Sequence, residues 1–231
     1  MRSPLISKEI ISPLFFVIFY IIEFIYPKYK FRNPYRNHIF NIAIGGFNYV
    51  IVTIFMIFCF QKAFGSFLVH NFKLNIIVSY LLYDLMIYFQ HRIFHKSDFL
   101  WKFHKLHHTD KTLNSTSGFR FHPVEILISM FVKLSFVVLF NLSAYEFAIF
   151  ELIILCSSVF IHANINSPMF IDKFLSNFIV TPRVHWVHHR PNRIETNSNF
   201  GFFISIWDKI FKTYIEKSGF ENSSEFGVKE D

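Results

Sequence analysis

Charged residues are scarce in this sequence. Only 17% of its 231 residues are Asp, Glu, Lys or Arg, whereas 52% are hydrophobic and 34 are phenylalanine. This composition is unlike that of a soluble domain and favours a membrane protein. Acidic residues are fewer than basic residues, which leaves a net charge of +7. Because the basic residues form no isolated polybasic tract, we interpret this charge as a face against anionic lipid and expect no nucleic acid partner.

Cysteine is also scarce, and this excludes two kinds of site. Cys59 and Cys156 both lie in apolar runs, which predicts buried thiols without a disulfide framework. The sequence contains no cysteine pattern for an iron–sulfur cluster and no appended haem-binding module. It also contains no internal repeat, low-complexity linker or domain boundary. We therefore expect a single domain over residues 1–231.

Long apolar runs, by contrast, are frequent. A helix needs about 20 residues to cross the hydrocarbon core, and the runs that approach this length are residues 10–26, 39–60, 76–94, 124–140 and 145–161. No small-residue cleavage site follows the first run, so we expect a retained helix and not a signal peptide. The short break at 141–144 predicts a hairpin of two spans. The sequence thus predicts an all-α membrane protein with about four to five transmembrane helices.

Several ionisable residues interrupt these runs. Glu23 lies near one end of the first run, where it can reach the lipid headgroups. Asp84 lies seven residues before His91, on the same side of a helix. Either Asp84 accepts a hydrogen bond from a metal-bound imidazole, or it makes a salt bridge or a helix-packing contact. The ionisable residues of the last two runs should face protein, one another or an interface; they are Glu125, Lys133, Glu146 and Glu151.

Histidine is concentrated in three boxes, HxxxH at 91–95 and HxxHH at 104–108 and 185–189. Their members are His91, His95, His104, His107, His108, His185, His188 and His189. Positions i, i+3 and i+4 share one face of a helix, so we expect each box to present its imidazoles in one direction. Neutral imidazole binds iron, zinc and copper. Eight histidines exceed what one four-coordinate zinc needs, and they predict a site for two metals.

The residues between these histidines exclude one familiar class of metal site. The helix of a zinc protease carries Glu directly after its first His, where it acts as the general base. Here Arg92 follows His91 and Lys105 follows His104. A single HxxxH box arises often by chance, but two further HxxHH boxes in one chain do not.

Three segments carry a resemblance to a known family. They read DLMIYFQHRIFH, WKFHKLHHTDKTLNSTSGFRFHPVE and TPRVHWVHHRPNRIETNSNFGFFISIWDKIFKTY, and they lie within residues 83–125 and 181–214. In their boxes, their order and the residues between, they resemble the fatty acid hydroxylase/sterol desaturase superfamily of membrane di-iron oxygenases. The similarity is greatest to its bacterial and alkylglycerol-monooxygenase-like branch.

The resemblance implies two iron ions, dioxygen as co-substrate, and hydroxylation or desaturation of a lipid or sterol-like molecule. An alkyl C–H bond offers no acid, base or leaving group, so a redox metal must supply the oxidant. Electrons then come from a separate donor, such as a ferredoxin, a cytochrome or a pterin. Hydroxylation is favoured, although both reactions share the first hydrogen abstraction and the ligand set does not separate them.

The resemblance also implies functional residues outside the boxes. His162 directly follows the last apolar run and is expected as a further metal ligand. His122 joins the predicted ligands, with a structural role in its Arg-x-His-Pro-x-Glu segment as the alternative. Asn166 is expected to hold a metal-bound water, and Asn199 is expected either to support a ligand or to be structural.

Four other classes of protein remain as alternatives. A haem-binding membrane electron carrier would place its histidines within separate spans, whereas these cluster outside the spans. A zinc-dependent membrane hydrolase would need a glutamate base beside a box. A metal transporter would need ionisable residues along its spans, where Asp84 is the main one. A catalytically silent relative would not need intact boxes.

The distribution of basic residues predicts the orientation in the membrane. Loop 27–38 carries four and residues 91–123 carry six, whereas loop 61–75 carries two and the hairpin tip carries none. The positive-inside rule then places loop 27–38, the boxes, His122 and His162 in the cytoplasm. We expect a cytoplasmic helical cap, residues 91–123 and 162–231, that holds a di-metal site. The last dozen residues should form a frayed tail. The membrane would be the bacterial inner membrane, or the endoplasmic reticulum in a eukaryote.

Single cysteines test this orientation in a chain whose two native cysteines are replaced by serine. Cysteines placed in loop 27–38 and after residue 190 should react with a membrane-impermeant thiol reagent only from the cytoplasmic side, because the positive-inside rule places both there. A cysteine in the hairpin at 141–144 is the control and should react only from the opposite side. Labelling of the tail from outside alone would contradict the charge argument.

Overall fold

The fold is built from α-helices, as the sequence predicts. The structure, a computed structural model, describes residues 4–30, 35–65, 74–216 and 225–228. Within these ranges it contains no β-strand, only the isolated bridges Pro27–Ile165 and Ile179–Ile204. In chain order the elements are α1 (Pro4–Ile25), α2 (Tyr35–Gly65), α3 (Ile76–Lys96), α4 (Asp98–His108), the 3-10 helix η1 (Ser115–Phe119), α5 (Pro123–Phe140), α6 (Ala144–His162), α7 (Met169–Leu175), α8 (Pro182–His188), α9 (Arg193–Thr196) and α10 (Ile206–Ile210).

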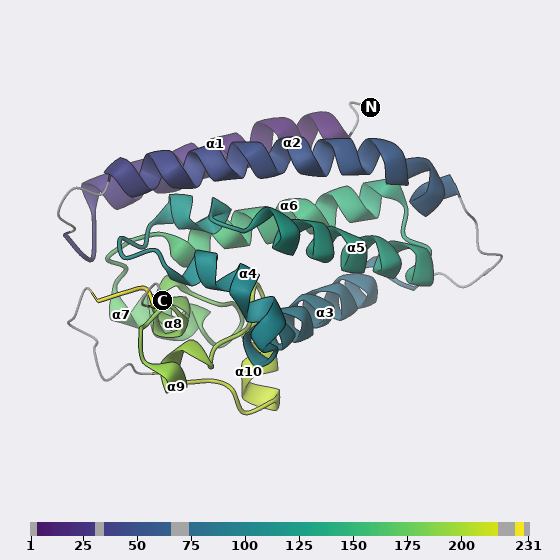
Figure 1. Cartoon of the computed structure of the whole chain (residues 1–231). Helices are drawn as coiled ribbons and strands as arrows, with labels where there is room; N and C mark the ends of the chain where they lie inside the picture. The colour runs from purple at the N-terminus through teal and green to yellow at the C-terminus, as the bar shows by residue number, and fades with distance from the viewer. Residues whose placement is uncertain (1–3, 31–34, 66–73, 217–224, 229–231) are drawn as a thin grey trace.

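The long helices form the body of the molecule (Figure 1). α1 packs against α6 and α2 packs against α5, so that α1 and α2 lie over this pair. α3 lies on the other side and contacts both α5 and α6. The turn between α5 and α6 lies at one end of the body, and α7, α8 and α9 gather at the other end. This second end also holds residues 26–30, as expected for a loop on the same side as the boxes.

Among the described residues, three helices are long and apolar enough to cross a membrane. They are Tyr35–Cys59 within α2, Pro123–Phe140 and Ala144–His162. α1 adds a shorter apolar stretch, Ile10–Ile25. α3, which covers the predicted span 76–94, is not one of the three. Its sequence includes the polar residues Asp84, Gln90, His91 and Arg92. The predicted helices are thus present, whereas a count of four to five spans stays a prediction.

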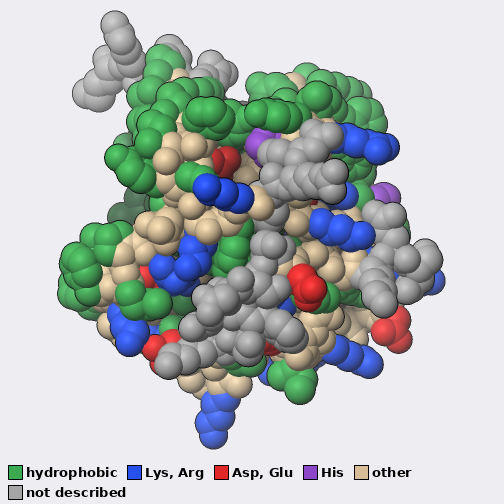
Figure 2. Space-filling view, turned by 90° about the vertical axis from the view of Figure 1, so that its left-hand side faces the viewer, with side chains coloured by type: hydrophobic (Ala, Val, Ile, Leu, Met, Phe, Trp, Pro, Cys, Tyr) green, Lys and Arg blue, Asp and Glu red, His purple; other side chains and the backbone are tan. Residues whose placement is uncertain are grey.

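The outward faces of α1 and α2 are apolar. Phe24, Ile39, Ile57 and Phe58 are each at least 70% exposed. Figure 2, which views the molecule end-on, shows hydrophobic side chains gathered over its upper part and most Lys and Arg side chains below them. An apolar surface of this extent marks an interaction site or a membrane contact. Together with the long apolar helices, it indicates an integral membrane protein.

The buried core lies among α3, α5 and α6. Tyr83 and Ile87 of α3 pack with Leu134 and Val137 of α5 and with Phe150 of α6. Side chains of α2 pack against this cluster from outside. The core holds α3 in register with the hairpin, and this decides where the first histidine box lies.

One residue turns α3 into α4. Ser97 has an extended backbone and its N–H donates to the Ile93 carbonyl where α3 ends. Its hydroxyl accepts a hydrogen bond from Leu100 N at the start of α4. Serine is a favoured helix N-cap because its oxygen satisfies a free backbone N–H. The corner brings the first two boxes together, with the rings of His91 and His104 4.9 Å apart.

The predicted hairpin at 141–144 is confirmed. Asn141 ends α5 in the left-handed conformation, with φ at 51°, which asparagine tolerates better than most residues. Ser143 and Glu146 then form a capping box at the start of α6. The capping box explains why an acid stands at the start of an apolar run.

The other ionisable residues of α5 and α6 face protein, as expected. Glu125 Oε1 lies 2.7 Å from His104 Nδ1. Lys133 Nζ lies 2.8 Å from Glu151 Oε1, and this pair joins α5 to α6. No carboxylate or ammonium of this set therefore has to face lipid alone.

Glu23 does not reach the lipid headgroups, which corrects the expectation for it. The side chain is buried, and its carboxylate accepts hydrogen bonds from Ser115 N at 2.9 Å, Ser115 Oγ at 2.8 Å and Asn164 N at 3.1 Å. Its oxygens therefore tie α1 to η1 and to the segment after α6. Such contacts join positions far apart in the sequence, so no local pattern announces them.

The expectation of a frayed tail is wrong for residues 225–228. Gly227 N donates to the His189 carbonyl at 3.0 Å, and Val228 N donates to the His108 carbonyl at 2.8 Å. Phe226 is buried against Tyr29. This segment, which we call the C-terminal strap, lies across the ends of two histidine boxes. Backbone hydrogen bonds and one aromatic side chain hold the strap. Neither kind of contact requires a periodic pattern of apolar residues, so the sequence of this segment shows none.

Two glycines provide a matched test of the helix packing. A Cβ at Gly118 would lie 2.8 Å from the Ser158 carbonyl oxygen of α6. We expect Gly118→Ala to lower the free energy of unfolding by about 1–3 kcal/mol, because one of the two elements must shift. A Cβ at Gly46 has no neighbour within 4 Å, so Gly46→Ala should be neutral or stabilising by about 1 kcal/mol. Denaturant unfolding in detergent measures both, and equal effects would contradict the close contact.

Candidate metal centre

Nine histidines converge in two groups. The first histidine group is His91, His95, His104, His108 and His188; the second histidine group is His107, His162, His185 and His189. Within each group, one ring nitrogen from every member lies within 4.8 Å of the others. The groups adjoin, since the rings of His108 and His189 stack with centroids 4.5 Å apart. The structure thus brings together all eight box histidines and adds His162 from the end of α6.

Each HxxHH box contributes to both groups, which corrects the expectation that a box points in one direction. In α4, the i, i+4 pair His104 and His108 belongs to the first group and His107 to the second. The same division occurs in α8, where His188 leaves its i, i+4 pair and joins the first group. Residues i and i+4 differ by about 40° around a helix, whereas direct neighbours differ by about 100°. The HxxHH spacing therefore lets one short helix serve two adjacent sites.

Backbone carbonyls orient four of the rings. The Nδ1 atoms of His91, His107, His162 and His188 lie 2.9, 3.3, 2.6 and 2.7 Å from the carbonyl oxygens of Phe200, Arg120, Ser158 and Ser198. A carbonyl oxygen only accepts, so each Nδ1 carries the proton and each Nε2 presents a lone pair. Metal-bound histidines have this arrangement.

The contact between His107 and His162 places two of these lone pairs close together. The two Nε2 atoms lie 3.0 Å apart, and neither carries a proton because both Nδ1 atoms donate to carbonyls. Protonation is opposed, because burial and the neighbouring imidazoles hold the pKa of His107 well below its usual range. Two nitrogens that share one metal ion at about 2.1 Å lie roughly 3.0–3.4 Å apart. The observed separation fits a shared ion.

Ring nitrogens without partners support the same fit. Nε2 of His91, of His95 and of His188, all in the first histidine group, are buried and make no hydrogen bond to the described residues. Buried polar atoms are normally paired, so an unpaired set that points at a common centre fits ligand atoms.

The imidazoles are also in the protonation state that metals require. Burial lowers the pKa of His188 to about 3. Burial, together with neighbouring imidazoles, holds the pKa of His108, His185 and His189 well below the usual range. Neutral imidazoles bind metal without first releasing a proton. The donor set therefore fits two metal ions, one beside each group.

Glu125 supports the first group and was not among the predicted site residues. Its Oε1 lies 2.7 Å from His104 Nδ1, and a carboxylate in this position orients a ligand ring and raises its basicity. Glu125 is the last residue of the Arg-x-His-Pro-x-Glu segment. This motif was the sequence feature from which a role for Glu125 in the site could have been predicted. Arg120 of that segment donates from Nε to the Leu106 carbonyl at 3.0 Å and so fastens the end of α4.

His122 lies outside both groups, so the structure does not support its prediction as a ligand. Its Nδ1 accepts a hydrogen bond from Val124 N at 3.1 Å, which makes it the N-cap of α5. Its ring packs on Phe103. His122 therefore has the structural role that was the alternative prediction for this segment. Glu125, three residues later, contacts His104 instead.

Asp84 makes a packing contact and does not contact an imidazole, which decides between its two predicted roles. Its Oδ2 accepts hydrogen bonds from Trp207 Nε1 at 2.8 Å and Ile204 N at 3.2 Å. His91 instead donates to the Phe200 carbonyl. Asp84 thus anchors to α3 the segment that carries this carbonyl.

Asn166 does not line the centre, which corrects its predicted role. Its side chain is exposed, and its backbone N–H donates to the Tyr26 carbonyl at 2.9 Å. No ring nitrogen of either histidine group is among its described contacts.

Asn199 supports the ligands from a distance. It is buried with φ at 49°, and its amide donates to the Val184 and Ile215 carbonyls at 2.8 and 2.9 Å. It stands between Ser198 and Phe200, whose carbonyls orient two ligand rings. Its structural role therefore reaches the metal centre through the backbone on either side of it.

An inner pocket of about 110 Å³ touches both groups. His91 and His104 of the first group and His107 and His185 of the second line it. Most of the remaining wall is apolar and comes from α3, α5 and α6. This pocket therefore adjoins both histidine groups.

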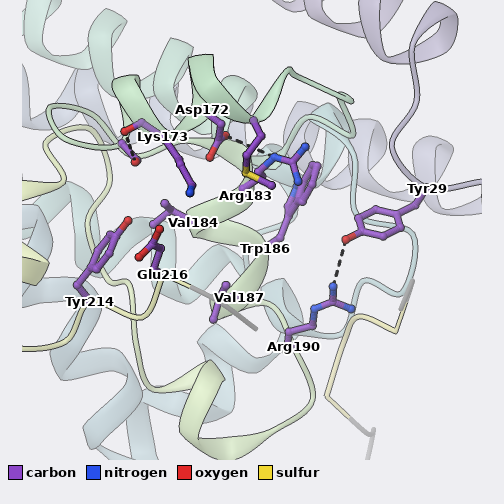
Figure 3. A pocket seen from close by; sticks show the side chains of 12 residues that line it. Tyr29, Asp172, Lys173, Arg183, Val184, Trp186, Val187, Arg190, Tyr214 and Glu216 are labelled. Carbon is purple, nitrogen blue, oxygen red and sulfur yellow. Dashed lines mark hydrogen bonds and ion pairs between the residues drawn. The ribbon is translucent and has the colours of Figure 1, made fainter. Parts of the chain in front are cut away.

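The outer face of α8 lines a different pocket of about 160 Å³ (Figure 3). Arg183 of this pocket lies 4.0 Å from Asp172, and Arg190 donates to the Tyr29 hydroxyl at 3.2 Å. None of the nine histidines lines it. Its charged wall and its place behind α8 separate it from the metal centre.

Single substitutions distinguish the members of the groups from the other histidines. We expect His107→Ala to lower the metal content of the purified protein and abolish turnover, because it removes one of four nitrogens from the second group. His122→Ala and His38→Ala should retain full metal content, since both lie outside the groups. Elemental analysis of protein from iron-replete cells measures this. Metal loss in His122→Ala equal to that in His107→Ala would contradict the grouping. His70, the remaining histidine of the sequence, is also expected to lie outside the metal centre, and it falls outside the described residues.

Comparison with known proteins agrees with this centre. Residues 76–213 match the family described as fatty acid hydroxylase. Among similar proteins, ornithine lipid hydroxylase OlsE of Rhizobium tropici is 28% identical over 145 residues, which cover 61% of this chain and 41% of that protein. Alkylglycerol monooxygenase of Homo sapiens is 27% identical over 136 residues, with 59% and 29% covered. Lathosterol oxidase of Homo sapiens is 24% identical over 147 residues, with 63% and 46% covered.

The chain spans less than half the length of these relatives. No solved structure matches it. The family match covers α3 to α10 and therefore contains all nine grouped histidines. By this match, the chain belongs to the fatty acid hydroxylase family.

Proposed function

We propose that this protein is an iron- and dioxygen-dependent membrane oxygenase that hydroxylates a lipid or sterol-like molecule. The observation that carries the proposal is the pair of imidazole groups at the end of a mainly apolar pocket. The proteins it is similar to are named for hydroxylation of an ornithine lipid, oxygenation of an alkylglycerol and oxidation of lathosterol. All three names describe oxidation of a lipid or a sterol.

Iron is proposed because of the chemistry that the pocket requires. Imidazole alone suits iron, zinc and copper, so the ligands leave the choice of metal open. Iron, when bound, supplies dioxygen activation, which an unactivated C–H bond needs and side chains do not provide. A zinc hydrolase would require a scissile bond. A haem carrier would require space for a macrocycle, whereas the candidate ligand nitrogens of each group here lie within 4.8 Å of one another.

The residues of the chain position the substrate and keep the centre dry. Phe94, Phe121 and Ile126 give the inner pocket apolar walls that suit an alkyl chain. Phe121 stacks on the His107 ring with centroids 4.4 Å apart. Trp101 covers the outer side of the first group and contacts His95. Exclusion of water limits side reactions and strengthens the electrostatic interactions inside the pocket.

The proposed reaction needs electrons from a second protein or small reductant. Hydroxylation converts R–H, O2, two electrons and two protons into R–OH and H2O. The sequence contains no cysteine pattern for an iron–sulfur cluster, so we propose a separate electron donor. The basic cap would face the cytoplasm, and the membrane would be the inner membrane of a bacterium or the endoplasmic reticulum membrane of a eukaryote. The chain would act as one domain over residues 1–231.

Lipid mass spectrometry tests the proposed reaction. Cells that express the wild-type chain should contain a lipid species heavier by one oxygen that is absent from cells expressing His107→Ala, because this variant loses a ligand. The purified wild-type protein should contain about two iron atoms per chain, one for each histidine group, and no haem absorption band. His38→Ala is the control and should give the wild-type lipid profile.

Other outcomes would redirect or refute the proposal. A species lighter by two hydrogens would assign desaturation instead of hydroxylation. One zinc without iron in protein from iron-replete cells would refute the di-iron centre. Turnover of a water-soluble substrate with no lipid difference would refute a lipid substrate.

A further inference from the structure

A second, larger cavity adjoins the inner pocket. It has a volume of about 520 Å³ and lies among α1, α2, η1, α5 and α6. Phe16, Gly46 and Leu155 are among its mainly apolar lining. Tyr49 on its α2 side is 69% exposed, so the cavity opens towards the apolar exterior of the bundle.

The two cavities form one route to the metal centre. Phe121, Ile126, Lys133 and Ile154 line both of them. We call this route, from the opening beside α2 to the rings of the inner pocket, the passage. Of the phenylalanines near the boxes, those that line it are Phe94, Phe119 and Phe121; Phe99 is exposed and Phe103 packs on His122.

An ion pair stands where the two cavities meet. Lys133 of α5 lies 2.8 Å from Oε1 and 3.0 Å from Oε2 of Glu151 of α6, and Tyr83 of α3 donates to the same carboxylate at 2.6 Å. Lys133 lines both cavities and Glu151 lines the outer one. Both residues belong to helices that are apolar and long enough to span a membrane. Ionisable groups in such positions are costly and mark functional sites.

Packing alone gives no reason for this pair to be charged. A buried ion pair is often no more stabilising than apolar side chains of similar volume. The Lys133 ammonium carries three N–H donors, and both of its described acceptors are oxygens of Glu151. One donor is thus left for an acceptor that enters the passage. An oxygen of a lipid, as a hydroxyl, an ether or a carbonyl, has this chemistry.

We propose that the Lys133–Glu151 pair is a specificity determinant that binds an oxygen-bearing group of the lipid in the passage. This rests on the proposed function, and it narrows the substrate class to lipids with such a group set apart from the reacting carbon. Lys133 lies eight residues beyond Glu125 on α5, so the two are roughly 12 Å apart along the helix. Because Glu125 contacts the ligand His104, this length sets the separation between the lipid oxygen and the carbon presented to the metals.

The test uses binding, which requires no turnover. The full chain in lipid nanodiscs is photolabelled with hexadecylglycerol that carries a diazirine at the end of its alkyl chain. Unlabelled hexadecylglycerol and hexadecane then compete for labelling, and only the former carries oxygen. For the wild type we expect hexadecylglycerol to compete at least about tenfold better, as expected for a hydrogen bond to a charged group.

The principal variant replaces both charges together, as Lys133→Met with Glu151→Leu, because removal of one alone leaves the other buried and unpaired. We expect it to bind hexadecane as before, while the preference for hexadecylglycerol disappears. Its unfolding midpoint should fall modestly, because the buried Tyr83 hydroxyl loses its acceptor on Glu151. Lys111→Met, at an exposed position, is the control for the lost charge. An undiminished preference in the double variant would overturn the proposal.

A second pair of variants tests the passage even if the double variant fails to fold. Gly46→Leu adds bulk at an open position in the cavity and should reduce labelling several-fold. Ala43→Leu adds the same bulk to an exposed position of α2 outside the lining and should leave labelling unchanged. Wild-type labelling of Gly46→Leu would overturn the passage. Neither result depends on iron or on oxidised lipid, so failure here is distinguishable from failure of the proposed function.

Discussion

Repulsion between neutral imidazoles is the constraint on which the centre of this protein depends. His107 and His162 hold their Nε2 lone pairs 3.0 Å apart, and burial opposes the protonation that would relieve the repulsion. A protein that keeps such contacts needs either a cation there or a rigid scaffold to hold the rings. The structure provides the scaffold, because four carbonyls from three separate segments fasten the Nδ1 sides of four rings.

The rest of the fold can be understood as the support for those carbonyls. Asp84 anchors the segment after Asn199 to α3, Glu23 ties η1 to α1, and the C-terminal strap binds the carbonyls at the ends of α4 and α8. Each contact uses a buried acid or a backbone group. A buried polar group of this kind is costly when it is unpaired. Other arrangements of the helices would break these pairs, so the contacts make the observed arrangement specific as well as stable.

The helical body, in turn, joins the polar metal centre to apolar surroundings. At one end, α5 carries Glu125, which contacts the His104 ring, and α6 carries His162 of the second histidine group. Both helices expose apolar faces along their length. We infer that the cavities between the helices form a route from lipid to the histidine groups, because they share four lining residues. The Lys133–Glu151 pair is the main ionic interruption of that route, and its position gives a chemical reason for selectivity among lipids.

The sequence by itself determined the fold class, the helices and the identity of the box histidines, because apolar periodicity and i, i+3, i+4 spacing are local properties. Tertiary structure alone decided which histidines share a site. It divided each HxxHH box between two groups, chose Glu125 over His122 as the residue that contacts a ligand, and left Asn166 exposed. It also docked the strap and turned Asp84 towards Trp207. These outcomes depend on contacts between residues far apart in the chain, and the geometry of such contacts is set by how the helices pack, which no local pattern contains.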